Sequence, residues 1–458
     1  MLKYLAFFWL IGAITLPSMV NGQSRKERNQ AKGYVEQADR AFQQKNYRDA
    51  VAGYALAVQL VPNNPYAHYR KGFSHFNLTE YDNAIREFSL ALSQGFSPLE
   101  IYRVRGYIYF QQKNYDAAID DLRKGLAIAP RDLPFLMALG EVNIEKKDLA
   151  EALSAFRRAA QIAPNNADID YNMAKIYFAS GSTREQADSA AAALAKGTRF
   201  PGEAHFLLGD AYQKLGNVPG AIESYQKAIN SKPDIYQAYR NLAEAYRNEN
   251  RFNDAVAISK QALRLFPQDG GIYTDLSWYY SLADRPDDAV EAGKAAITFS
   301  PNEYMGYTNL CRAYNEVKKY DLAITTCNAA LARRPGDGES YFYLARAYNL
   351  TNRAAEATKY YKLAVTGLID YTAGSPNYSD GWYLLGNAYF ADNQRDNAIG
   401  AYLKCLALSP KFSKARYNLG IIYTLKKNKA AALEQYDRLI ALDAKLAAGL
   451  KSEIDKIR

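Results

Sequence analysis

The sequence contains few of the residues on which metal sites and nucleophilic active sites depend. Its 458 residues include only three cysteines and three histidines. The histidines are His68, His75 and His205, and the first two are seven positions apart rather than three or four, the spacing of a shared ligand face. No HExxH, Walker loop, dinucleotide glycine fingerprint or GxSxG elbow occurs. We therefore expect a non-enzymatic protein with no catalytic residues, no metal and no cofactor.

Concentrated charge of one sign is also missing. The chain has 57 Lys and Arg against 48 Asp and Glu, and the net charge of +9 is spread along its length. No dense basic block that would bind phosphates occurs, so we expect no nucleic-acid partner. The pI of about 9.0 nevertheless leaves an RNA-binding helical repeat as an alternative. Apolar residues make up 48% of the chain, which excludes disorder as its main state.

A long hydrophobic run occurs only at the N-terminus. Lys3 precedes an apolar run over residues 5–16, Pro17 ends it, and small or apolar residues stand at the −3 and −1 positions before Gln23. This pattern predicts a cleavable signal peptide over residues 1–22 and export to the periplasm, cell envelope or extracellular space. The basic residues at 25, 26 and 28 oppose translocation, so an uncleaved anchor stays open as the alternative. No later segment is predicted to span a membrane.

The most informative feature of the sequence is a 34-residue period. Alanine recurs at this spacing in three series, at residues 50, 84, 118 and 152, at 221, 255, 289, 323 and 357, and at 398 and 432. Nearly all residues twelve positions before these alanines are small. Twelve positions after most of them stand prolines, which are Pro62, Pro130, Pro164, Pro233, Pro267, Pro301, Pro335 and Pro410. Within each unit, apolar residues recur at helical spacing in two stretches separated by a polar break.

Each repeated feature has a physical reason in a pair of antiparallel helices. Two helices approach to about 8–10 Å between their axes only if the contact residues are small. Proline cannot continue a helix and therefore marks the end of the second one. A single hairpin cannot bury its apolar face, whereas a stack of hairpins can. The period thus predicts an all-α solenoid.

This pattern resembles the tetratricopeptide repeat (TPR), most clearly in "WYLLGNAYFADNQRDNAIGAYLKCLALSP" at residues 382–410. The residues that fall on the signature positions of that family are Trp382, Leu385, Gly386, Tyr389, Ala398, Tyr402 and Pro410. The resemblance covers essentially the whole chain after its N-terminal segment. It implies an all-α fold, a right-handed superhelical solenoid of about twelve antiparallel helix pairs.

The repeat frame also predicts the organisation of the chain. The predicted segments are a signal peptide at 1–22, a short linker at 23–30, units 1 to 5 at 31–201, units 6 to 10 at 202–378, units 11 and 12 at 379–446, and a capping helix at 447–458. An insertion is expected near residues 372–378. The unit at 167–201 lacks its proline, and because irregular units serve some solenoids in dimerisation, self-association stays open.

Cys311 and Cys327 fall on facing positions of one predicted hairpin. Cys311 occupies the small position of the first helix, and Cys327 a position of the second helix where other units carry an aromatic residue. Two interpretations stay open, which are buried packing and a disulfide in an exported chain. A metal or catalytic role lacks a third ligand nearby. Cys405 stands alone on a buried helix position and is expected in the core.

The resemblance further implies where binding occurs, since the first helices of successive TPR units line a concave groove that holds a peptide or protein segment. The predicted groove residues are Tyr66, Tyr69, Phe73, Phe76, Arg103, Tyr107, Phe110, Arg240, Glu244, Arg247, Trp278, Arg312, Arg346, Tyr383, Asn387 and Asn418. A partner segment with apolar and acidic portions would match these aromatic rings and arginines. Burial between units for the aromatic residues, and pairing with carboxylates for the arginines, stay open as alternatives.

These observations predict a scaffold or adaptor that binds a protein or peptide segment. The alternative is an accessory subunit of an envelope enzyme complex, such as a glycosyltransferase or a protease. The repeats fill this chain, so the catalytic domain would belong to another protein.

Overall fold

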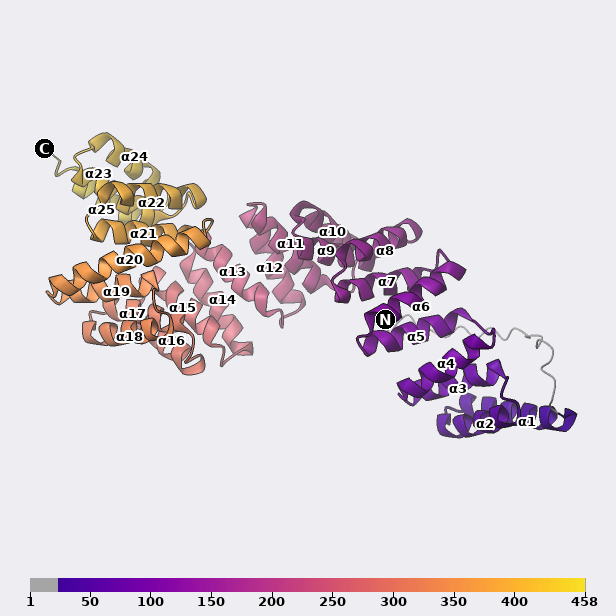
Figure 1. Cartoon of the computed structure of the whole chain (residues 1–458). Helices are drawn as coiled ribbons and strands as arrows, with labels where there is room; N and C mark the ends of the chain where they lie inside the picture. The colour runs from indigo at the N-terminus through magenta and orange to yellow at the C-terminus, as the bar shows by residue number, and fades with distance from the viewer. Residues whose placement is uncertain (1–23, 458) are drawn as a thin grey trace. The chain divides into compact units, whose positions relative to one another are not determined.

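The fold consists of α-helices alone in the part of the chain that the structure describes. The computed structural model describes residues 24–457, which form 25 helices and no strand (Figure 1). The helices follow one another as twelve pairs and a final single helix, and the predicted all-α fold of paired helices is confirmed. None of the described helices is long and apolar enough to cross a membrane. The predicted signal peptide at 1–22 lies outside the described residues.

The chain divides into two compact units, one ending at Leu207 and the other beginning at Leu208. The helices of the N-terminal unit are α1 (Arg25–Gln43), α2 (Tyr47–Leu60), α3 (Pro65–Asn77), α4 (Tyr81–Ser93), α5 (Leu99–Gln111), α6 (Tyr115–Ile128), α7 (Leu133–Lys146), α8 (Leu149–Ile162), α9 (Ala167–Ser180) and α10 (Thr183–Ala195). The boundary lies within α11 (Pro201–Lys214).

The C-terminal unit contains the longer part of the array. Its helices are α12 (Val218–Ser231), α13 (Tyr236–Asn248), α14 (Phe252–Leu265), α15 (Gly270–Leu282), α16 (Pro286–Phe299), α17 (Tyr304–Glu316), α18 (Tyr320–Arg333), α19 (Gly338–Leu350), α20 (Ala354–Gly374), α21 (Ser379–Ala391), α22 (Arg395–Leu408), α23 (Ser413–Leu425), α24 (Lys429–Ile440) and α25 (Ala444–Ile454).

The turn inside each helix pair repeats as regularly as the helices do. Each of the twelve turns holds one residue with positive φ, and glycine supplies it in two of them, at Gly181 and Gly216. The other ten are Lys45, Thr79, Lys113, Lys147, Asn250, Asp284, Lys318, Asn352, Asn393 and Lys427. A left-handed residue ends the first helix and reverses the chain, so the polar breaks seen in the sequence are these turns.

Within several pairs, a glycine of the first helix lies against an aromatic ring sixteen residues later. A Cβ atom on Gly72 would lie 2.7 Å from the ring of Phe88, and a Cβ atom on Gly386 would lie 2.5 Å from the ring of Tyr402. The rings on this repeat position that are fully buried belong to Tyr54, Phe88, Phe156, Tyr225 and Tyr402. Glycine therefore allows the ring to pack directly on the backbone of the neighbouring helix, and this contact fixes the spacing within the pair.

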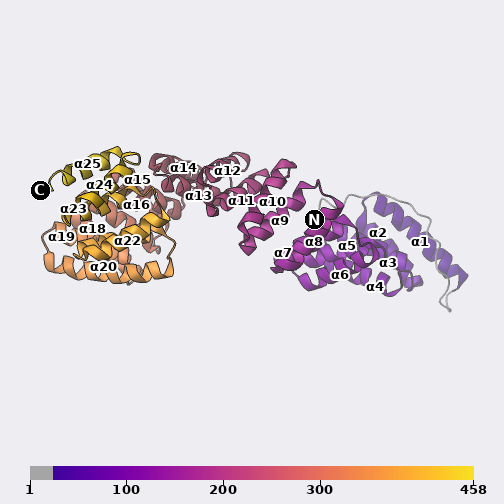
Figure 2. The same ribbon diagram turned by 90° about the horizontal axis from the view of Figure 1, so that it is seen from above.

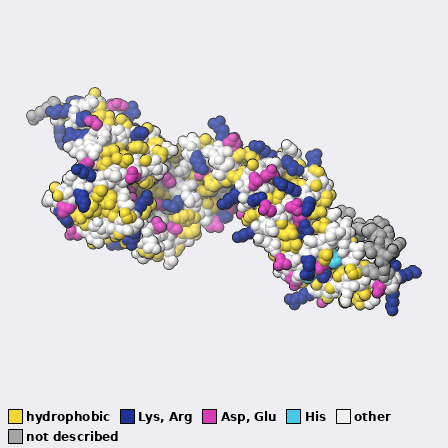
Figure 3. Space-filling view, viewed as in Figure 1, with side chains coloured by type: hydrophobic (Ala, Val, Ile, Leu, Met, Phe, Trp, Pro, Cys, Tyr) yellow, Lys and Arg dark blue, Asp and Glu magenta, His cyan; other side chains and the backbone are white. Residues whose placement is uncertain are grey.

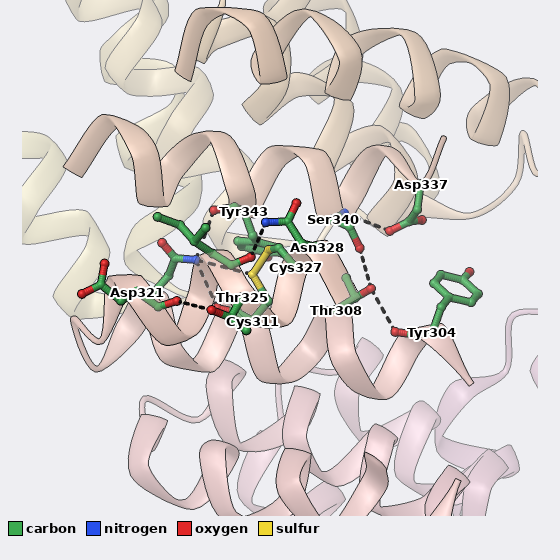
Figure 4. The surroundings of a disulfide bond; sticks show 12 residues. Tyr304, Thr308, Cys311, Asp321, Thr325, Cys327, Asn328, Asp337, Ser340 and Tyr343 are labelled. Carbon is green, nitrogen blue, oxygen red and sulfur yellow. Dashed lines mark hydrogen bonds between the residues drawn. A yellow bond between two sulfur atoms is a disulfide. The ribbon is translucent and has the colours of Figure 1, made fainter. Parts of the chain in front are cut away.

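Cys311 and Cys327 occupy the equivalent positions in α17 and α18, and they form a disulfide (Figure 4). Their Cα atoms are 5.3 Å apart, and both side chains are fully buried. Asn315 donates hydrogen bonds of 3.1 Å to the carbonyl oxygens of Cys311 and Tyr343, which links the pair to α19. A covalent bond thus joins two helices that a glycine and a ring join elsewhere. Cys405 is a buried free thiol, and burial raises its pKa.

Three predicted boundaries differ from the structure. The expected linker at 23–30 is helical from Arg25, because Ser24 and Glu27 form a capping box that starts α1 early. The expected insertion near 372–378 is partly helical, since α20 runs to Gly374 and is the longest described helix, and residues 375–378 form the loop after it (Figure 2). The capping helix α25 begins at Ala444 rather than at 447, because Asp443 caps it.

The close contact of Gly386 generates a stability prediction with a matched control in the same helix pair. Gly386→Ala places a methyl group against the Tyr402 ring and should destabilise the chain by roughly 1–3 kcal/mol. Gly400→Ala, at an exposed position of α22 with no atom within 4 Å, should be neutral or stabilising by up to about 1 kcal/mol. Thermal unfolding followed by circular dichroism checks both, and equal midpoints for the two variants would contradict the account.

The disulfide generates a second prediction. The protein, unfolded without a reductant, should show one titratable thiol, that of Cys405, and three after reduction. Replacing both Cys311 and Cys327 with alanine should lower the free energy of unfolding by roughly 3 kcal/mol. The reason is that a bond between residues 16 positions apart restricts the conformations of the unfolded chain. Three thiols before reduction would show that the two cysteines are packed but not bonded.

Candidate functional site

A cavity of about 610 Å³ lies in the C-terminal unit. Its wall is formed by the first helices of five consecutive pairs, α13, α15, α17, α19 and α21, together with the turn before α19 and the C-terminal half of α20. Gln237, Arg240, Asn241, Glu244 and Arg247 of α13 line it, and their spacing of three or four residues places them on one face of the helix. The cavity therefore lies on the side of this unit that its first helices form.

Four predicted groove residues line this cavity, namely Arg240, Glu244, Arg247 and Trp278. Arg240 donates a 2.8 Å hydrogen bond to Asp275 of α15. Burial raises the pKa of Asp275, and the neighbouring Arg240 opposes that rise. The guanidinium of Arg240 is thus already paired with a carboxylate of the wall and is not free to bind an acidic ligand.

Arg247 makes the most deeply buried ion pair of the wall. It donates a 2.6 Å hydrogen bond to Asp380 of α21, although the two residues are 133 positions apart. The exposed fractions of the two side chains are 8% and 2%. Glu244 lies 3.5 Å from the same guanidinium, and the pKa of Arg247 is raised, mainly by Asp380 acting against burial. This pair ties the two ends of the cavity wall together.

Arg312 is buried behind the wall rather than open to the groove. Its guanidinium carbon lies 3.8 Å from the ring centre of Trp278, and it donates a hydrogen bond to Asn309. Glu339 is the nearest carboxylate, with an N–O distance of 3.9 Å. Burial raises the pKa of Glu339 to about 7, with the Arg312 charge opposing the shift and Asp337 and Asp380 adding to it. The interpretation of Arg312 as a free ligand-binding arginine is not supported by this arrangement.

The predicted groove residues of the N-terminal unit pack mainly against one another. Phe73 is 7% exposed and its ring centre lies 5.1 Å from that of Phe88, while Tyr107 is 6% exposed and lies 6.0 Å from Phe76. The other predicted residues here, Tyr66, Tyr69, Phe76, Arg103 and Phe110, are partly exposed. Arg103 pairs with Asp132 at 3.1 Å. For Phe73 and Tyr107 the structure thus favours the alternative of burial between helices.

The remaining predicted residues lie on α19, α21 and α23 and do not line the cavity. Arg346 is exposed, and Tyr383 packs on Phe412 with ring centres 4.8 Å apart. Asn387 accepts hydrogen bonds from the hydroxyl of Tyr402 at 2.6 Å and from Asn418 at 2.9 Å. Asn387 and Asn418 are therefore engaged within the chain.

The projection from sequence missed part of the wall. The missed residues that carry charge or an aromatic ring are Asp275, Tyr279, Tyr304, Arg334, Asp337, Glu339, Asp370, Tyr371, Tyr378 and Asp380. Asn241, Asp275 and Asn309 all line the cavity and are spaced by 34 residues, so they occupy the same repeat position. Projecting that position along the chain would have predicted them. Asp370, Tyr371 and Tyr378 come from the lengthened α20 and the loop after it, which no repeat position predicts.

The arrangement offers charged and aromatic contacts but no metal cluster. Within residues 24–457, no three His, Cys, Asp or Glu side chains are grouped so that they could hold a metal ion. The cavity lining contains three arginines and six carboxylates, besides five aromatic side chains. Elsewhere on the surface, basic and acidic groups are intermixed, as on the face in Figure 3. The cavity thus differs from its surroundings in carrying an excess of carboxylates.

Comparison with protein families gives a consistent result along the chain. A model of the tetratricopeptide repeat matches residues 35–98, 74–132, 104–167, 206–270, 240–304, 312–376 and 383–447. A second model with the same description matches residues 143–200. No curated protein matches the chain.

Comparison with solved structures finds likenesses of low TM-score. The chain is similar to MamA (24% identity, covering 38% of this chain and 94% of that one, TM-score 0.34). It is also similar to a chain of the APC/C hetero-tetramer Cut9–Hcn1 (12% identity, covering 93% of this chain and 96% of that one, TM-score 0.36). A third similar structure is the P58(IPK) TPR domain (16% identity, covering 71% of this chain and 99% of that one, TM-score 0.24). At these TM-scores the likenesses carry no argument about function.

The raised pKa of Glu339 generates a prediction about pH. The folded chain binds this proton more tightly than the unfolded chain, whose carboxyl titrates near 4.5, so stability should fall as the pH rises from about 4.5 to 7. Glu339→Gln removes the titration and should therefore stabilise the chain more at pH 8 than at pH 5, as measured by urea unfolding.

The matched control for this experiment is Glu356→Gln on α20. Glu356 is partly exposed, and its hydrogen bond with Arg353 lowers its pKa, so the substitution should not reproduce the gain at pH 8. A Glu339→Gln effect of equal size at both pH values would show that burial does not hold the proton on this carboxyl.

Proposed function

The chain belongs to the tetratricopeptide-repeat family, and from that premise we propose that it is a non-enzymatic scaffold that binds a segment of another protein in the cavity of its C-terminal unit. Members of this family act in protein–protein interaction. The observation that carries the proposal is the cavity itself, about 610 Å³ of space walled by five first helices. Such a volume is in the range of specific binding sites and accommodates several side chains of an extended segment.

The wall is preorganised for binding. Arg240–Asp275 and Arg247–Asp380 hold neighbouring and distant helices in fixed positions before any ligand arrives. A partner therefore meets side chains whose conformational entropy has already been lost, which strengthens binding relative to a flexible surface. Trp278 and Tyr304 add rigid aromatic area of the kind that contributes most at interfaces.

We further propose that the protein is exported to the periplasm or the cell envelope. The leader-like pattern of residues 1–22 supports this location. The Cys311–Cys327 disulfide supports it independently, because disulfides persist mainly in oxidising compartments.

A site-specific crosslink tests the proposed site. A photoreactive benzoylphenylalanine at Met305, which lines the cavity and is 50% exposed, should capture a partner protein when the full chain is expressed in its native cell. The matched control is the same residue at Leu322, which is 47% exposed on the second helix of the same pair and does not line the cavity.

The expected result is an ultraviolet-dependent adduct of higher mass at position 305 that is absent at position 322. Mass spectrometry of the adduct identifies the captured segment. Equal capture at both positions, or capture at 322 alone, would show that the cavity is not where this protein binds its partner.

A further inference from the structure

We propose that the cavity of the C-terminal unit is a cation pocket that receives an arginine or lysine side chain of the bound segment. The inference rests on the proposed function and specifies the chemistry of the partner. It also replaces the acidic partner expected from the sequence, for which the arginines of the groove would have to be free.

The charges of the wall are the first argument. Two of its three arginines, Arg240 and Arg247, are neutralised by Asp275 and Asp380. The third, Arg334, donates a hydrogen bond to the hydroxyl of Tyr304 and lies 4.7 Å from the centre of that ring. Four further carboxyl groups line the cavity. Glu244 shares the guanidinium of Arg247, and the raised pKa of Glu339 keeps it partly protonated near pH 7, whereas the other two are Asp337 and Asp370. The wall thus has more carboxylates than its own cations can balance.

Unsatisfied acceptors are the second and independent argument. The side chain of Asp380 is only 2% exposed, yet one of its two oxygens, Oδ1, has no hydrogen-bond partner. Oε1 of Glu339 is likewise buried without a hydrogen bond, and its nearest cationic nitrogen, on Arg312, lies at 3.9 Å, too far for one. A buried acceptor without a donor is costly, and a guanidinium or ammonium group from a ligand brings several donors.

Aromatic walls are the third argument. Trp278, Tyr279, Tyr304, Tyr371 and Tyr378 all line the cavity. Aromatic faces attract cations, and this attraction grows when the cation is removed from water. The chain already uses the contact beside the cavity, where the guanidinium of Arg312 lies on the ring of Trp278. Carboxylates beside aromatic rings favour a basic side chain over a neutral or acidic one.

Fluorescence titration of the full chain tests the inference, with Trp278 as the reporter in the wall. The probes are four blocked heptapeptides, acetyl-Gly-Ser-Ala-X-Ala-Ser-Gly-amide, in which X is arginine, lysine, citrulline or glutamate. Citrulline keeps the shape of arginine without its charge. We expect the arginine peptide to bind at least tenfold more tightly than the citrulline peptide, and the glutamate peptide to bind most weakly. Trp278→Phe should remove the signal, whereas Trp382→Phe should retain it.

Two wall carboxylates provide the variants. The double variant Glu244→Gln/Asp370→Asn should weaken the arginine peptide at least fivefold and leave the citrulline peptide unchanged. Asp380 is left intact because its removal would also leave the buried Arg247 without its carboxylate partner. Glu356 is a partly exposed carboxylate of α20 that does not line the cavity, so Glu356→Gln should change neither affinity.

Several results would overturn the inference. Equal affinity for the arginine and citrulline peptides, or tighter binding of the glutamate peptide, would show that charge attraction does not govern the pocket. Spermidine binding without arginine-peptide binding would show that the pocket takes a free polyamine instead. Absence of any peptide binding up to 5 mM would also end it. None of these results decides the proposed function, which the crosslink at Met305 tests separately.

Discussion

The close approach of the two helices in each pair is the constraint on which the rest of the structure depends. A glycine in the first helix allows an aromatic ring of the second to pack on its backbone, as Gly72 and Phe88 show. Several pairs are fixed in this way, and a pair of helices exposes an apolar side that a neighbouring pair can cover. Stacking then follows, and the first helices of consecutive pairs come to line one surface. In α17 and α18 the disulfide maintains this spacing where the ring is missing.

The cavity of the C-terminal unit follows from that stacking together with one departure from it. The ion pair between Arg247 and Asp380 joins helices that the repeat alone would not bring into contact, since 133 residues separate them. The lengthened α20 adds Asp370 and Tyr371 to the wall. A regular array thus provides the scaffold, and its irregular part gives the site its acidic and aromatic character.

The paired-helix fold could be predicted from the sequence, because most helix pairs repeat a small residue, a polar turn and a terminal proline, and many add a ring. Projecting the first-helix positions also found Arg240, Glu244, Arg247 and Trp278 on the cavity wall. Their pairing could not be predicted, because it depends on how far the stack curves within the unit. The alternative that carboxylates pair with the arginines holds for Arg240 and Arg247, whereas the expected acidic portion of the partner stays a prediction. The part of the wall that α20 forms was also missed, because the residues that lengthen this helix do not recur at the 34-residue period.

Hydrogen–deuterium exchange of the full chain, with and without the captured partner segment, tests the central claim most directly. The account predicts that the segment slows exchange in the helices of the cavity wall, which are α13, α15, α17, α19, α21 and the second half of α20. The second helices α14, α16 and α18 should change little, because they do not line it. Protection confined to those second helices, or to the N-terminal unit, would contradict it.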